Sequence, residues 1–149
     1  MGLYNHALWQ VAVKALLFDE KGKILTLTTP DGYLDFPGGR VDESEWDTPW
    51  ATSLQREIKE ELGGAVRFDI KETVFVSKRQ YHREGQTHYI AAIYFRCDYK
   101  GGAVELSDEH AQFMWQTPED ILRGDQRPMS ADEQKQFELY FKGLSNIRR

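Results

Sequence analysis

Residues 36–64 read FPGGRVDESEWDTPWATSLQREIKEELGG, and the second half of this stretch predicts a helix. Its apolar side chains recur at spacings of three and four, which places them on one stripe of an α-helix. They are Ala51, Leu54, Ile58 and Leu62. Thr48-Pro49 is a start signal, since Pro at the first helical position loses no needed hydrogen bond and the preceding residue can cap. Gly63-Gly64 is a stop signal, so we expect a helix from about Pro49 to Leu62.

Three glutamates share a second face of the predicted helix. At about 100° per residue, Glu57, Glu60 and Glu61 lie on neighbouring turns and point the same way. Like charges at this spacing repel by roughly a few tenths of a kcal/mol per pair, so a cation would stabilise them. The preceding Pro37-Gly38-Gly39 allows close backbone approach, which turns carbonyl oxygens toward the same place. Oxygen ligands of this kind suit Mg²⁺ or Mn²⁺.

A glutamate-rich helix can instead be a solvated surface, and Arg56 with Glu60 forms an i,i+4 pair typical of one. The order of the whole stretch argues against that interpretation. Its fixed positions are Gly39, five residues, Glu45, then Arg56-Glu57-Ile58, one residue, Glu60-Glu61, one residue and Gly63. This ordered set resembles the Nudix box, the signature of Nudix hydrolases.

The stretch departs from the Nudix box at two points. Ten residues separate Glu45 from Arg56 where the box usually has seven, so the loop before the helix carries three extra residues around Trp46-Asp47-Thr48. The last box position, normally aliphatic, is Gly64. The insertion precedes the helix, so the spacing of the three glutamates is unchanged.

The resemblance implies a fold and a chemistry. It implies an α/β Nudix fold, a mixed β-sheet sandwiched between helices, and metal-dependent hydrolysis of the diphosphate linkage in a nucleoside diphosphate derivative. Mg²⁺ or Mn²⁺ would be held by carboxylates and one backbone carbonyl, and Arg56 would orient the carboxylates. The implied metal ligands are Gly38, Glu57, Glu60 and Glu61. The candidates for accepting a proton from water are Glu57, Glu60 and Glu109, the last lying in the loop before the final predicted strand.

Several of these predictions keep more than one alternative. Asp108 and Glu105 are alternatives to Glu109, and His110 is a candidate for substrate contact rather than for a zinc site. The substrate is a nucleoside triphosphate, a nucleotide sugar, ADP-ribose or a dinucleoside polyphosphate, and the protein is a monomer or a homodimer. The aromatic candidates for base recognition are Tyr33, Phe75, Tyr81, Tyr89 and Trp115. The rival function is a non-catalytic Nudix-fold sensor that binds a nucleotide and regulates a partner.

Composition narrows the class of protein. The 149 residues are 40% apolar and 29% charged, as expected for one globular domain spanning residues 1–149. A net charge of −5 argues against binding to long nucleic acid but not against a metal-bridged nucleotide. The sequence has neither a membrane-spanning run nor a signal peptide, so we expect a cytoplasmic location and no membrane partner. Cys97 is expected to be a buried thiol.

Outside the box, alternation and turn residues predict further strands and two helices. Arg79 lies with Lys78 and Arg83 near the end of a predicted hairpin, where the three could contact phosphates or be surface charges. We favour the surface interpretation for each. Phe137, Tyr140, Phe141 and Leu144 are expected to pack the last helix on the sheet. The predicted strands are 11–18, 24–28, 33–36, 66–80, 88–99 and 113–115, and the helices are 118–123 and 130 onward.

Overall fold

The structure is a computed structural model that describes the backbone of residues 5–147 and the side chains of residues 5–143. The elements are β1 (Trp9–Phe18), β2 (Ile24–Thr28), β3 (Leu34–Asp35), β4 (Gly38–Arg40), the 3₁₀ helix η1 (Glu43–Glu45), α1 (Trp50–Leu62), β5 (Arg67–Arg83), β6 (Gln86–Gly101), β7 (Gln112–Gln116), α2 (Pro118–Arg123) and α3 (Ala131–Ile147). Among the described helices, none is long and apolar enough to cross a membrane.

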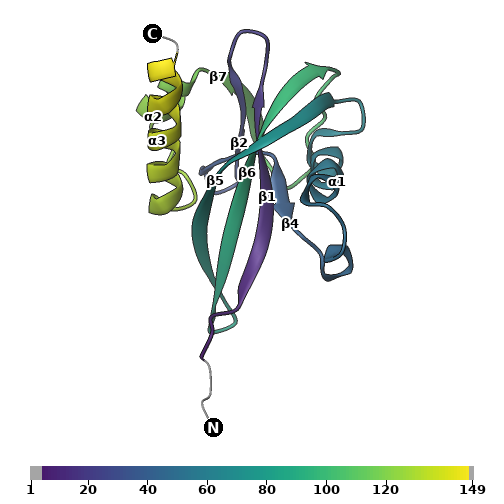
Figure 1. The fold of residues 1–149 in the computed structure, drawn as a ribbon, viewed down its shortest axis with the longest axis vertical. Helices are drawn as coiled ribbons and strands as arrows, with labels where there is room; N and C mark the ends of the chain where they lie inside the picture. Colours follow the sequence, from purple (N-terminus) through teal and green to yellow (C-terminus); the bar gives the residue numbers. More distant parts are fainter. Residues whose placement is uncertain (1–4, 148–149) are drawn as a thin grey trace.

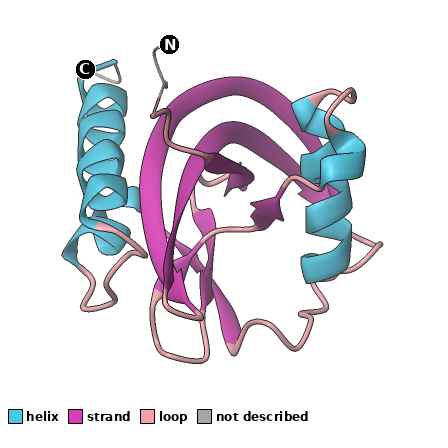
Figure 2. Ribbon diagram, turned by 90° about the horizontal axis from the view of Figure 1, so that it is seen from below, coloured by secondary structure: helices cyan, strands magenta, loops and turns pink. Residues whose placement is uncertain are grey.

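Strand β1 is the centre of a mixed sheet. It pairs in parallel with β6 over its whole length, while its other edge is shared by β4 and the start of β2. The strand order is β3-β2-β1-β6-β5, with β4 attached to β1 and β7 to β2. Helix α1 covers one face, and α2 and α3 lie on the other (Figure 1). Figure 2 shows the curved sheet between these two helical layers. This confirms the predicted α/β fold with a mixed sheet between helices.

The sheet has a buried layer of side chains on each face. On the α1 side, the predicted stripe residues Leu54, Ile58 and Leu62 are buried. The layer on the α3 side is aromatic and contains Phe36, Tyr94, Phe137 and Phe141. Each such side chain contributes about 1.5–3 kcal/mol through burial, so both helices are fixed to the sheet by their apolar faces. Tyr140 packs against the same layer, as expected, and the Leu144 side chain lies outside the described residues.

Two local predictions are wrong in detail. The polar connection expected at residues 81–86 is a two-residue turn, Glu84-Gly85, so both flanking strands are longer than expected. Both turn residues have positive φ, 52° and 74°, which suits the twist of a tight hairpin. Thr48 does not cap α1, because its hydroxyl donates to the Glu45 carbonyl at 2.8 Å and Pro49 occupies the N-cap. The inserted residues thus close a turn after η1 before α1 begins.

Cys97 is buried, as expected, and its desolvation raises the pKa of the thiol to about 12. The thiol therefore stays protonated near neutral pH and packs as a small apolar group.

Candidate functional site

The glycine pair in front of α1 allows two close contacts. Gly38 pairs with Lys14 of β1 and has φ of 132°, and a Cβ there would lie 2.0 Å from the Val13 carbonyl oxygen. A Cβ on Gly39 would lie 2.5 Å from the Glu57 carboxylate. A side chain is therefore excluded at Gly38 by the backbone of β1, and a side chain at Gly39 would force the Glu57 carboxylate to move.

The three glutamates of α1 line one polar hollow of about 560 Å³. The carboxylate side chain of Glu57 is 12% exposed and that of Glu60 is 58% exposed, while Glu61 is buried. Glu109 lines the same hollow from the loop before β7. The predicted convergence of these four carboxylates on one space is therefore present in the structure.

Arg56 connects the carboxylates of this hollow through its planar guanidinium. Its Nε and Nη2 donate to the two oxygens of Glu45 at 3.0 and 2.7 Å, a bidentate contact. Its Nη1 lies 3.1 Å from Glu57 Oε1 and 3.2 Å from Glu60 Oε2. Hydrogen bonds from Arg56 lower the pKa of Glu45 to about 2. Glu45 thus positions Arg56 across the insertion, and Arg56 positions the two glutamates.

Burial makes two of the carboxylates hard to ionise. Desolvation raises the pKa of Glu61 to about 7, in spite of attraction to Lys14. Desolvation also raises the pKa of Glu57, against the attraction of Arg56. The Gly38 N–H donates to Glu61 Oε2 at 3.3 Å. The fixed charges of the protein therefore compensate these two glutamates only in part.

A buried network of charges adjoins the hollow, and the sequence analysis missed it. Lys14 Nζ lies 3.1 Å from Asp35 Oδ1 and donates to the Gly38 carbonyl at 3.1 Å. Arg79 Nη2 lies 3.1 Å from the same Asp35 oxygen and 2.5 Å from Glu133 Oε1. Desolvation would raise the pKa of Asp35, yet Lys14, His110 and Arg79 hold it well below its usual range.

The surface interpretation of Arg79 is therefore wrong, because its side chain is only 10% exposed. Lys78 and Arg83, on the same strand, are exposed as expected. One signal was available in the sequence, since Lys14 is a charged residue in the middle of the otherwise apolar run VAVKALLF. A lysine buried in a central strand needs an acidic partner, and Asp35 in the short strand β3 provides it.

The loop before β7 adds a second cluster of potential ligand atoms. Glu61, Glu109 and His110 each place one ligand atom within 4.8 Å of the others. His110 Nε2 lies 3.5 Å from Asp35 Oδ2, and its buried Nδ1 has no hydrogen-bond partner among the described residues. Glu105, an alternative to Glu109, packs instead against Gly63 at the end of α1. Neither Glu105 nor Asp108 lines the hollow.

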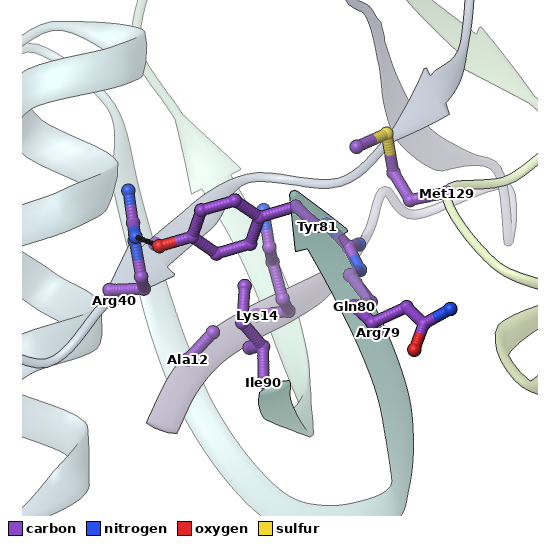
Figure 3. Close-up of a pocket in the computed structure, with 9 residues that line it drawn as sticks. Ala12, Lys14, Arg40, Arg79, Gln80, Tyr81, Ile90 and Met129 are labelled. Carbon is purple, nitrogen blue, oxygen red and sulfur yellow. Dashed lines mark hydrogen bonds between the residues drawn. The ribbon is translucent and has the colours of Figure 1, made fainter. Parts of the chain in front are cut away.

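A second, smaller pocket of about 250 Å³ opens beside the carboxylate hollow and shares Lys14, Gly39 and Arg40 with it. Figure 3 shows Tyr81, Ile90 and Met129 around this pocket, with the Arg40 guanidinium hydrogen-bonded to the Tyr81 hydroxyl at 2.7 Å.

The other aromatic candidates lie elsewhere. Phe75 stacks on Tyr94 within the core, and Tyr89 contacts Trp9. Tyr81 is therefore the aromatic candidate that the structure brings next to the carboxylates, because neither Tyr33 nor Trp115 lines these two pockets.

Comparison with known proteins identifies the family. A model of the NUDIX domain matches residues 8–140. The chain belongs to the Nudix family. The resemblance to Nudix hydrolases, inferred from the ordered set of residues from Gly39 to Gly63, is thereby confirmed. A search of curated proteins returned no match to this Nudix chain.

Solved structures agree with this assignment. This Nudix chain is 25% identical to a MutT protein from Methanosarcina mazei Go1, with a TM-score of 0.76 over 95% of this chain and 99% of that one. It is also 25% identical to the E. coli ORF135 protein, with a TM-score of 0.71 over 99% and 98% of the two chains. An ADP-ribose pyrophosphatase from Streptococcus suis 89-1591 shares the fold at 19% identity, with a TM-score of 0.62 over 91% of each chain.

The donor set of this Nudix protein fits a hard divalent cation. The hollow offers carboxylate oxygens from Glu57, Glu60 and Glu61, and Gly39 leaves no atom between the backbone and Glu57. The unpaired Nδ1 of His110 lies beside Glu61 and Glu109. Oxygen-rich sites with incompletely compensated charge are the kind that Mg²⁺ and Mn²⁺ occupy.

Proposed function

We propose that this protein hydrolyses a phosphoanhydride bond in a nucleoside diphosphate derivative, with Mg²⁺ or Mn²⁺ as cofactor. The observation that carries the proposal is the convergence of Glu57, Glu60, Glu61 and Glu109 on one polar hollow. Four carboxylates in one space repel one another and a phosphate, so they suit phosphate chemistry only when cations lie between them. Family membership supports the same chemistry.

Each residue of the hollow has a distinct task in this proposal. Glu57, Glu60 and Glu61 hold the cations, and the Gly38 carbonyl offers a further oxygen. Lys14 fixes the direction of that carbonyl through its hydrogen bond of 3.1 Å. Bound Mg²⁺ would neutralise phosphate charge and lower the pKa of a water molecule. Arg56 keeps the carboxylates of Glu57 and Glu60 in place rather than touching the reacting atoms.

Three carboxylates are candidates for the base that takes the proton from the attacking water. Glu57 and Glu60 lie on α1, and Glu109 approaches from the loop before β7. Glu60 and Glu109 are both exposed. A carboxylate that holds a cation can also orient water, so these tasks overlap.

The rival function, a nucleotide sensor without turnover, has less support. A sensor has no need of the metal-holding carboxylates, yet this chain has Glu57, Glu60 and Glu61 in one hollow together with Arg56. The two functions differ in a single observable, which is release of phosphate, pyrophosphate or a mononucleotide.

The test is a panel of nucleoside triphosphates, nucleotide sugars, ADP-ribose and dinucleoside polyphosphates, each with Mg²⁺ or Mn²⁺. We expect turnover of at least one substrate, and we expect Glu60→Gln or Glu61→Gln to lower it a hundredfold or more, on the scale of losing a metal-held charge. Glu72→Gln is the matched control, because Glu72 is exposed on β5 and outside the hollow. Near-normal turnover in both site variants would contradict the proposal. Tight binding without turnover would favour the sensor.

A further inference from the structure

The loop insertion before α1 forms part of a second hollow, which we call the tryptophan groove. It has a volume of about 550 Å³, and its apolar lining is Trp9, Val11, Val41, Trp46, Pro49 and Trp50. Trp46, Trp9 and Trp50 are 84%, 43% and 46% exposed. Large aromatic side chains left in water around one concave surface are typical of a binding site.

The sequence order explains why this groove exists. Trp9 begins β1, Trp46 is the C-cap residue directly after the 3₁₀ helix η1, and Trp50 is the first residue of α1. The three extra residues around Trp46 lengthen the path between η1 and α1. The insertion therefore supplies Trp46 itself to the groove.

The groove is continuous with the carboxylate hollow. Arg40 and Asp42 line both of them. Arg40 also lines the pocket of Tyr81 (Figure 3). All three hollows therefore share Arg40: the polar carboxylate hollow, the pocket with Tyr81 and Met129, and the tryptophan groove.

Charge decides which part of a ligand enters the groove. Its polar lining includes Asp42, Glu43 and Glu45, and both oxygens of Glu45 are already engaged by Arg56. Acidic side chains repel a phosphate but accept hydrogen bonds from N–H and O–H groups. The groove thus suits an uncharged flat ring that carries such donors, while phosphates lie over the cation site beside Arg40.

We propose that the tryptophan groove binds the second nucleoside of a dinucleoside polyphosphate. The inference rests on the proposed function, and it narrows the substrate to molecules with a base at each end of a phosphate chain. One base occupies the pocket of Tyr81, the phosphates cross the carboxylate hollow past Arg40, and the other base stacks on Trp46. Stacking on one aromatic side chain contributes about 5- to 150-fold to binding.

The first experiment compares diadenosine tetraphosphate with ATP as substrates in the presence of Mg²⁺. Trp46→Ala is expected to raise the KM for diadenosine tetraphosphate, relative to the KM for ATP, by fivefold or more. Trp46→Phe should restore most of the loss, because it keeps an aromatic face. Leu139→Ala is the matched control, since Leu139 is 58% exposed on α3, outside all three hollows. An unchanged KM ratio in Trp46→Ala would overturn the proposal.

The second experiment measures binding without turnover. A methylene-bridged diadenosine tetraphosphate should quench tryptophan fluorescence, and Trp46→Phe should remove most of the quenching. If no substrate is hydrolysed and this quenching persists, the proposed function fails and the groove assignment stands. If the protein hydrolyses a substrate but the quenching does not depend on Trp46, the proposed function stands and the groove assignment is refuted. A concentration-dependent dimer that Trp46→Ala dissociates, with the KM ratio unchanged, would assign the groove to a second copy of the chain instead.

Discussion

Two clusters of charged side chains, the buried network and the carboxylate hollow, lie next to each other beside β1. They differ in how far the protein's own charges compensate them. In the buried network, Lys14 and Arg79 face Asp35 and Glu133, and His110 is a further partner of Asp35. Their hydrogen bonds close within the protein, apart from single atoms such as Arg79 Nε and Glu133 Oε2. This cluster supports the fold, because its charges are compensated by other charges of the chain.

The carboxylate hollow is balanced only in part by the chain. Glu57 and Glu60 share the guanidinium of Arg56, which is already held by Glu45. Glu61 is buried with one backbone N–H as its hydrogen-bond donor. Burial raises the pKa of Glu133 in the network, as it does for Glu57 and Glu61 in the hollow. The candidate site differs from the structural ion-pair network because several of its carboxylates share one guanidinium and line an open polar hollow.

The largest expected effect on stability comes from removing one charge of the buried network. Arg79→Met leaves Glu133 buried without its cation, and loss of one partner of a buried pair costs about 3–5 kcal/mol. Denaturant unfolding measures this change in the free energy of unfolding. The matched control is Arg83→Met on the same strand, which is exposed and should change stability by less than about 0.5 kcal/mol.

A double variant sharpens that result. Arg79→Met with Glu133→Leu removes both charges and should recover part of the lost stability, because neither charge is left buried alone. The recovery is incomplete because the buried Tyr94 hydroxyl loses Glu133 as its acceptor. Equal unfolding free energies for Arg79→Met and Arg83→Met would show that the network does not stabilise the fold.

The buried carboxylate of Glu61 in the hollow should make the free energy of unfolding depend on pH. The pKa of Glu61 rises from 4.5 to about 7 through burial, so the folded state binds this proton more tightly than the unfolded state. Its contribution is fully present below about pH 4.5 and is lost as pH rises through about 7. At roughly 1.4 kcal/mol per unit over the rise from 4.5 to about 7, the full loss is on the order of 3 to 4 kcal/mol. Urea unfolding at pH 5 and pH 8 with EDTA should therefore show a flatter dependence for Glu61→Gln than for the wild type; parallel curves would contradict this.

Gly39→Ala should disturb the hollow without unfolding the protein. The added Cβ would lie 2.5 Å from the Glu57 carboxylate, which has to move away. Misplacing a catalytic group by about 1 Å can cost up to a hundredfold, so we expect a 10- to 100-fold lower turnover. Gly143→Ala is the matched control, because a Cβ there meets no atom within 4 Å. Equal turnover in the two variants would mean that the position of Glu57 does not matter.

The smallest expected effect is stabilisation by the cation itself. Mg²⁺ at ten times its Kd should stabilise the wild type by about 1.4 kcal/mol, or raise the Tm by about 3 °C or more. The Glu57→Gln/Glu61→Gln double variant should lose this shift, and Glu72→Gln should keep it. A shift of equal size in all three proteins would place the cation elsewhere.

The part of the fold that depends on local sequence was predictable. The spacing of Leu54, Ile58 and Leu62 predicted α1, and Gly63 marked its end. The same helical geometry placed Glu57 and Glu61 toward one space. These predictions succeeded because residues a few positions apart in a helix have fixed relative directions.

The part that depends on distant pairs was not predictable. Arg79 and Glu133 are 54 positions apart, and nothing near either residue in the sequence indicates the other. The tryptophan groove likewise combines the start of β1 with the loop before α1. Only the unusual lysine at position 14 indicated that buried charge was present. Contacts between residues so far apart in the sequence can be identified only from the folded structure.

Glu133 also limits how the C-terminal helix can be exchanged. It lies in the first turn of α3, is fully buried, and holds Arg79, which in turn contacts Asp35 next to Gly38 and the carboxylate hollow. A chimera that grafts the last helix of another Nudix protein onto this sheet would have to carry an acidic residue at the same place. Without it, the graft would leave the buried Arg79 guanidinium with Asp35 but without its second carboxylate partner.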